Sequence, residues 1–95
     1  MPEMLFSIRW PDGQAEQCYS PSLVIKDFLQ PGCSYPLDEF LSKSREALNI
    51  ASQRVEARYG MPCSRALGQL ARIESAGQRY LATPDARVTV ESFTE

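Results

Sequence analysis

The stretch from Pro36 to Tyr59 constrains the fold most, because its apolar side chains recur at alternating steps of four and three residues. This stripe consists of Leu37, Leu41, Ser44, Leu48, Ala51 and Val55, and is widened by Phe40, Ala47 and Tyr59. Side chains at these spacings lie on one side of an α-helix. The pattern therefore predicts an amphipathic helix of about six turns, whose apolar side needs another surface to cover it.

A second helix is predicted directly after the first. Gly60 suits the position after a helix end, where the backbone turns left-handed, and Pro62 suits a helix start. The apolar positions that follow are Ala66, Leu67, Leu70, Ile73 and Tyr80. A link this short predicts that the two helices form an antiparallel helical hairpin.

Two segments alternate apolar and polar residues, as a half-buried strand does. One runs from Met4 to Trp10 and the other from Arg87 to Glu91. Asp12-Gly13 predicts a two-residue hairpin turn, after which residues 14–19 return as a strand. This register sets Arg9 opposite Glu16, and Phe6 opposite Tyr19.

A third, short helix is predicted over residues 23–29, between a start signal at Ser20-Pro21-Ser22 and a stop signal at Pro31-Gly32. The resulting fold class is α+β, in the order β-β-α-α-α-β, over a single domain that spans residues 1–95. We expect a three-stranded, mainly antiparallel sheet packed on the helical hairpin. The covered face is predicted to carry Phe6, Ile8, Val88 and Val90.

The absence of histidine among the 95 residues limits the chemistry more than any other feature of the composition. It removes Ser-His-Asp and Cys-His catalysis and the usual zinc ligand sets. The three cysteines, Cys18, Cys33 and Cys63, are too widely spaced for a local metal motif or a secreted disulfide framework. We therefore predict reduced thiols, no catalytic residue, no metal and no cofactor. With no signal peptide or long apolar run, we expect a cytoplasmic protein without a membrane partner.

Charge is segregated along the chain. Residues 1–42 hold two basic and six acidic groups, whereas residues 43–80 hold seven basic and three acidic ones. Arg65, Arg72 and Arg79 recur every seven residues, which aligns them along one side of the second helix. They are candidate contacts to an anion or an acidic partner, and the alternative is an ordinary solvated helix face. A net charge of −2 argues against nucleic acid.

Cys63 and four aromatic residues are further candidates for a site. Cys63 falls at the start of the second helix, where the helix dipole lowers a thiol pKa; otherwise it is a small buried hydrophobe. Trp10 is either an exposed anchor or part of the core. Tyr19, Tyr35 and Tyr59 either line a ligand pocket between hairpin and helices or close the core.

A series of short motifs resembles one bacterial family. In order, they are Trp10-Pro11-Asp12-Gly13, Cys18-Tyr19-Ser20-Pro21-Ser22, Pro31-Gly32, Tyr35-Pro36-Leu37, Tyr59-Gly60 and Cys63-Ser64. Together they resemble the small nitrogen-starvation-response proteins encoded beside a nitrilase in multi-gene clusters. The resemblance covers nearly the whole chain. It implies a physiological context and neighbouring enzymes, but no catalytic residues.

From these observations we expect a non-catalytic accessory protein that binds a protein partner, such as an enzyme of the same cluster. Because a chain this small buries only about 60–65% of its unfolded surface, we also expect it to form a homo-oligomer. One alternative is a small-molecule sensor or carrier with a pocket between hairpin and helices. Another is a small enzyme that uses the Cys63 thiolate.

Overall fold

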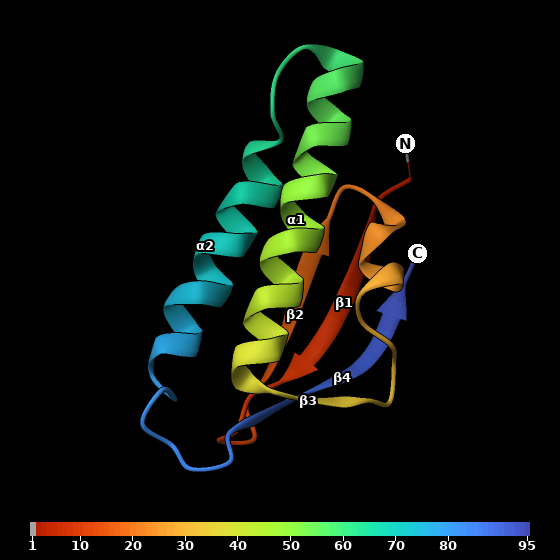
Figure 1. Cartoon of the computed structure of the whole chain (residues 1–95). Helices are drawn as coiled ribbons and strands as arrows, with labels where there is room; N and C mark the ends of the chain where they lie inside the picture. Colours follow the sequence, from red (N-terminus) through yellow and green to blue (C-terminus); the bar gives the residue numbers. More distant parts are fainter. Residues whose placement is uncertain (1) are drawn as a thin grey trace.

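The computed structural model describes residues 2–95 and consists of two layers, a sheet and a pair of α-helices that cover one of its faces (Figure 1). The sheet has four antiparallel strands in the order β2-β1-β4-β3. The elements are β1 (Met4–Arg9), β2 (Ala15–Ser20), the 3₁₀ helix η1 (Leu23–Asp27), β3 (Ser34–Pro36), α1 (Leu37–Tyr59), α2 (Ser64–Gln78) and β4 (Arg87–Thr94). The predicted α+β class is confirmed.

The prediction of three strands was wrong, because β3 forms a fourth strand at the sheet edge. It has three residues and pairs with the first part of β4. Hydrogen bonds from Gly32 N to Val90 O and from Val90 N to Cys33 O continue this pairing toward the preceding turn. Three residues are too few to show a period of two, and Pro36 is tolerated because it lies in an edge strand.

The predicted register of the first hairpin was also wrong by one residue. Ile8 lies opposite Glu16 and Phe6 opposite Cys18, so the loop has three residues. Trp10 N donates to Gln14 O at 2.9 Å, closing that loop. The reason is Pro11. A two-residue turn would need its N–H, which proline lacks, whereas proline fits the second position of a type I turn.

A bulge in β4 changes which of its side chains face the helices. Ile8 pairs with Val90 but Ser7 pairs with Ser92, so Glu91 is the extra residue. After the bulge the alternation is reversed, and Phe93 packs against the core as Val90 does. The strand therefore contributes apolar surface along its whole length.

Residues 23–29 were predicted as a short helix, and the structure has a 3₁₀ helix, η1, in part of that segment. Ser22 is its N-cap, and its hydroxyl oxygen accepts a hydrogen bond from the Val24 N–H at 3.2 Å. Val24 and Ile25 are buried. The start signal was therefore correctly placed.

The helices α1 and α2 begin and end near the predicted positions. Gly60 ends α1 in the left-handed region, with φ of 84°, and its N–H donates to the Glu56 carbonyl. α2 begins two residues after Pro62, at Ser64. Because α1 has 23 residues and α2 has 15, they pair over only part of α1. The predicted hairpin holds only in the coarser sense of two consecutive helices that pack together (Figure 1).

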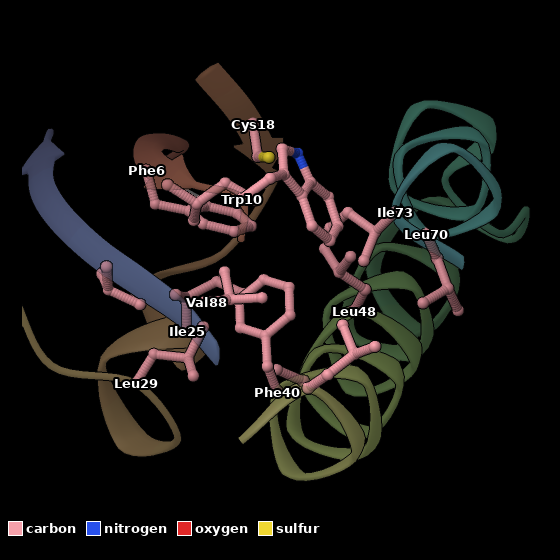
Figure 2. Close-up of a cluster of buried hydrophobic side chains, with 14 of the residues drawn as sticks. Phe6, Trp10, Cys18, Ile25, Leu29, Phe40, Leu48, Leu70, Ile73 and Val88 are labelled. Carbon is pink, nitrogen blue, oxygen red and sulfur yellow. The ribbon is translucent and has the colours of Figure 1, made fainter. Parts of the chain in front are cut away.

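The core lies between the sheet and the helices. The face predicted to be covered is fully buried, with Phe6, Ile8, Val88 and Val90 each at 0% exposure. Figure 2 shows Trp10, the residue after β1, and Phe40 from α1 in one cluster with Phe6 and Val88. The rings of Trp10 and Phe40 meet edge to face at 5.9 Å, and Trp10 also stacks on Tyr80 at 5.7 Å. Aromatic packing of this kind joins both layers.

Candidate functional site

Helix α2 packs beside β2, which is an edge strand of the sheet (Figure 1). Of the three predicted arginines, Arg65 and Arg72 lie on α2 and Arg79 is its C-cap residue. Arg65, Arg72 and Arg79 are all exposed. The guanidinium of Arg65 lies over the ring of Tyr19, 3.8 Å from its centroid, and its Nη1 is 4.0 Å from Glu3 Oε2. Among residues 2–95, no carboxylate oxygen lies within 4.0 Å of a guanidinium nitrogen of Arg72 or Arg79. Two of the three guanidinium groups therefore form no ion pair within the described residues, although Arg79 is near enough to help lower the pKa of Asp12.

Gln69 lies between these arginines and contacts the edge strand. Its Oε1 accepts a hydrogen bond from the Tyr19 N–H at 3.0 Å, since that N–H points away from β1. The side chain is 9% exposed, and its Nε2 has no hydrogen-bond partner within residues 2–95. The Tyr19 donor fixes which end of the amide is the oxygen. A buried NH₂ group is thus left with two unused donors.

Two neighbouring hollows lie between α2 and the edge of the sheet, and together they form what we call the groove of α2. One part is a hollow of about 340 Å³ lined by Tyr19, Arg65, Gly68, Gln69 and Arg72. A neighbouring hollow of about 260 Å³ is lined by Glu16, Arg72, Ser75, Ala76 and Arg79. Arg65 lines the first hollow, Arg79 lines the second, and Arg72 lines both.

Tyr19 contributes a neutral donor at the outer end of the groove. Burial raises the pKa of its phenol, and the hydrogen bond that it donates to Glu3 Oε2, at 3.2 Å, raises the pKa further. The phenol therefore keeps its proton at neutral pH. It also provides the flat surface on which Arg65 rests.

The other candidate aromatic residues lie in other parts of the fold than Tyr19. Tyr35 is on β3 at the opposite sheet edge, where its hydroxyl oxygen accepts the Gln30 N–H at 2.8 Å. Tyr59 is 65% exposed at the end of α1. Within residues 2–95 the three tyrosines thus line no common pocket. Trp10 is 4% exposed and belongs to the core, with its indole N–H donating to Glu16 Oε1 at 2.9 Å.

No disulfide joins the three cysteines. Cys63 is half-buried at the N-cap of α2, where its own N–H donates to Ser52 Oγ at 3.1 Å. Cys18 is buried on β2, and this burial raises its pKa. Cys33 precedes β3 at the other edge. No group of three or more metal-ligating side chains occurs in the part of the chain that the structure describes.

Sequence reasoning identified the arginines but missed Gln69 and Gly68. One signal for Gln69 was present. It falls on the apolar stripe of α2, three residues after Ala66 and four before Ile73, where a polar side chain must be buried. Its role also depends on the edge of β2, and no pattern within the helix shows where that edge lies.

Fold and groove together define a small two-layer α+β protein with a basic groove between a helix and a sheet edge. No helix within residues 2–95 combines the length and apolar character that crossing a membrane requires. The chain belongs to the family described as "Nitrogen starvation-induced protein NitG", whose family model matches residues 5–93. No curated protein and no solved structure matches the chain.

Proposed function

We propose that the chain is a cytoplasmic, non-catalytic accessory protein of the nitrogen-starvation response that binds an acidic surface on a partner protein through the groove of α2. The family membership supports the physiological context. The observation that carries the binding role is the row of Arg65, Arg72 and Arg79, of which two have no carboxylate within 4.0 Å among residues 2–95. Aligned, exposed guanidinium groups recognise carboxylates through paired hydrogen bonds.

The expected partner is an enzyme encoded in the same gene cluster, which we expect to include a nitrilase. This part of the proposal rests on the resemblance to cluster-encoded proteins. A non-catalytic role is favoured because the chain has no histidine to act as a base for Cys63.

Self-association is a further part of the proposal. Tyr59, Met61 and Leu67, at and after the end of α1, are 65%, 72% and 40% exposed. A second copy that covered these side chains would bury apolar surface that a small domain cannot bury alone. Native mass spectrometry of the protein from nitrogen-starved cells measures copy number and partners in the same spectrum. A spectrum with only the monomer would contradict this part.

The binding role is tested by capture of partners from nitrogen-starved cells. The variant R65Q/R72Q/R79Q removes the groove charges. The control K26Q/R45Q/R58Q removes three other exposed or partly exposed cations and changes the net charge equally. We expect the groove variant to lose the co-purifying enzyme and the control to keep it. Equal capture by both variants would show that the arginines are not the contact.

The structure also gives one reason to consider a small-molecule sensor or carrier. The hollow of about 340 Å³ is large enough for a small anion, and one of the residues that line it is Gln69, whose buried NH₂ group has no partner within residues 2–95. A sensor predicts that a cluster metabolite raises the unfolding temperature, because a ligand at 100 times its dissociation constant adds about 2.7 kcal/mol to stability. The thiol alternative predicts that Cys63 is alkylated near neutral pH faster than a free thiol with a pKa of about 8.5.

A further inference from the structure

We propose that the groove contains a carboxylate-binding site built from Arg65, Gln69 and Arg72. The inference deepens the proposed function and rests on it, because it names the group that the partner or ligand must present. The three side chains occupy positions i, i+4 and i+7 of α2, so they line one side of the helix. All three line the same hollow beside Tyr19.

The first support for a ligand is the unsatisfied amide of Gln69. Its Nε2 is buried without a partner in residues 2–95, although buried donors are nearly always paired. The oxygen end cannot rotate away, since it accepts the Tyr19 N–H at 3.0 Å. Gln69 itself lines the hollow together with Arg65 and Arg72. An acceptor bound there within reach of Nε2 would satisfy the amide.

The second support is Gly68, which lines the hollow next to Gln69. Glycine inside a helix costs about 1 kcal/mol relative to alanine. Nothing lies within 4 Å of a Cβ built at Gly68, so no packing contact requires its small size. The backbone there is not in the left-handed region either, since only Gly13, Gly32 and Gly60 have positive φ among the glycines of residues 2–95. The missing side chain leaves the hollow open.

A carboxylate fits these donors better than other anions. The two guanidinium groups and the amide are planar donors, and a guanidinium fork matches the two oxygens of a carboxylate. The chain also places one carboxylate of its own nearby, because Glu3 Oε2 lies 3.2 Å from the Tyr19 hydroxyl and 4.0 Å from Arg65 Nη1. That carboxylate lies at the outer end, lining another hollow with Tyr19 and Arg65, and leaves Gln69 and Arg72 unoccupied.

The carboxylate can come from an acidic side chain of the partner or from a free small acid. Both sources are tested by nuclear magnetic resonance on the ¹⁵N-labelled full chain. Glutarate, a peptide rich in glutamate and inorganic phosphate are titrated separately at constant ionic strength. We expect saturable shifts of the Gln69 side-chain NH₂ signals and of the Arg65 and Arg72 Nε–H signals.

Saturation by glutarate assigns the source to a free acid, and saturation only by the peptide assigns it to an acidic side chain. No saturable shift with either, or tighter binding of phosphate than of both, would overturn the proposal. If carboxylates fail to bind but capture of the enzyme still depends on the arginines, the proposed function stands and this inference falls. If carboxylates bind but the arginine variant captures the enzyme as the wild type does, this inference stands and the proposed function falls.

Variants make the assignment specific. Arg72→Gln is expected to weaken binding roughly tenfold or more, because it removes a charge-assisted hydrogen bond. Gln69→Glu keeps an acceptor for the Tyr19 N–H but replaces the free NH₂ with oxygen, so binding is expected to be lost. Gly68→Leu fills the hollow with a side chain that favours helix, so binding is lost without loss of fold. Arg58→Gln, on α1, is the control and is expected to bind as the wild type does.

Discussion

Two buried serines on α1 provide a direct test of how hydrogen-bond satisfaction affects the stability of this fold. Ser44 and Ser52 are 0% and 4% exposed. Ser44 Oγ has no hydrogen-bond partner within residues 2–95, whereas Ser52 Oγ accepts the Cys63 N–H at 3.1 Å. Replacement by alanine deletes the same oxygen at both positions. We expect the two substitutions to change the free energy of unfolding in opposite directions.

The gain expected for Ser44→Ala follows from three terms. Removing a buried hydroxyl that has no partner recovers about 1–3 kcal/mol. Helix propensity adds less than about 0.7 kcal/mol, since alanine is the better helix former. The void left by one oxygen costs about 0.3 kcal/mol for a volume of roughly 10–15 Å³. The net result is a stabilisation of about 1–3 kcal/mol, and each kcal/mol raises Tm by about 4–8 °C in a domain of this size.

The loss expected for Ser52→Ala comes from the group that it leaves behind. The Cys63 N–H at the start of α2 would lose its acceptor while still partly buried, at a cost of about 1–3 kcal/mol. Helix propensity offsets a few tenths of this cost. The net expectation is a destabilisation of about 1–2 kcal/mol, together with a looser connection between the two helices.

Urea denaturation of the wild type, both single variants and the double variant at neutral pH measures these changes. The serines are eight residues apart on one helix, about 12 Å, so their effects should add to within about 0.5 kcal/mol. A lower unfolding midpoint for Ser44→Ala, or changes of the same sign in both single variants, would refute the reasoning from buried polar atoms.

Three further predictions concern other parts of the fold. Gly77→Ala places a Cβ 2.9 Å from Leu41 Cδ2, so the shift that Leu41 must make offsets part or all of the helix gain of about 1 kcal/mol, whereas Gly68→Ala, in open space, keeps this gain; we expect Tm to rise more for Gly68→Ala than for Gly77→Ala. Asp12 has a pKa below its ordinary value of 3.8, chiefly because its carboxylate accepts a main-chain N–H. Its contribution to stability is therefore complete above pH 3.8 and is lost as the pH falls through the lower pKa of the folded state. In the variant Asp12→Asn, the unfolding midpoint should fall less steeply with decreasing pH in this acid range. Burial raises the pKa of Cys18, so iodoacetamide should label it only after urea unfolds the chain, as read by peptide mass spectrometry; labelling of the folded protein at the rate of a free thiol would contradict this.

Periodicity in the sequence predicted the helices and strands whose own residues show a clear apolar repeat. The strand at Met4–Arg9, the long helix ending before Gly60 and the closing strand from Arg87 each show enough repeats to indicate both type and buried face. β3 could not be predicted in this way, because three residues carry no period. Its pairing depends on the distant strand β4.

The candidate site was predictable to a similar extent. A repeat of seven residues is visible within one helix, so the shared side of Arg65 and Arg72 could be inferred. The unsatisfied amide of Gln69 could not, because it results from the approach of α2 to the edge of β2. The hairpin register was missed since one proline, Pro11, changes the loop length and with it every opposite pair.

The order of the strands in the sheet has a consequence for how the protein is made. β1 lies between β2 and β4, and Arg9 of β1 contacts Glu91, 82 positions further along the chain. At a synthesis rate of about 5–20 residues per second, one side of β1 stays without its partner for roughly 4–16 seconds after β1 itself is made. During that time the first hairpin presents bare hydrogen-bonding groups and an apolar face inside the cell. Chaperone occupancy of the nascent chain is therefore expected to be highest before residue 87 emerges from the ribosome and to drop once β4 is available.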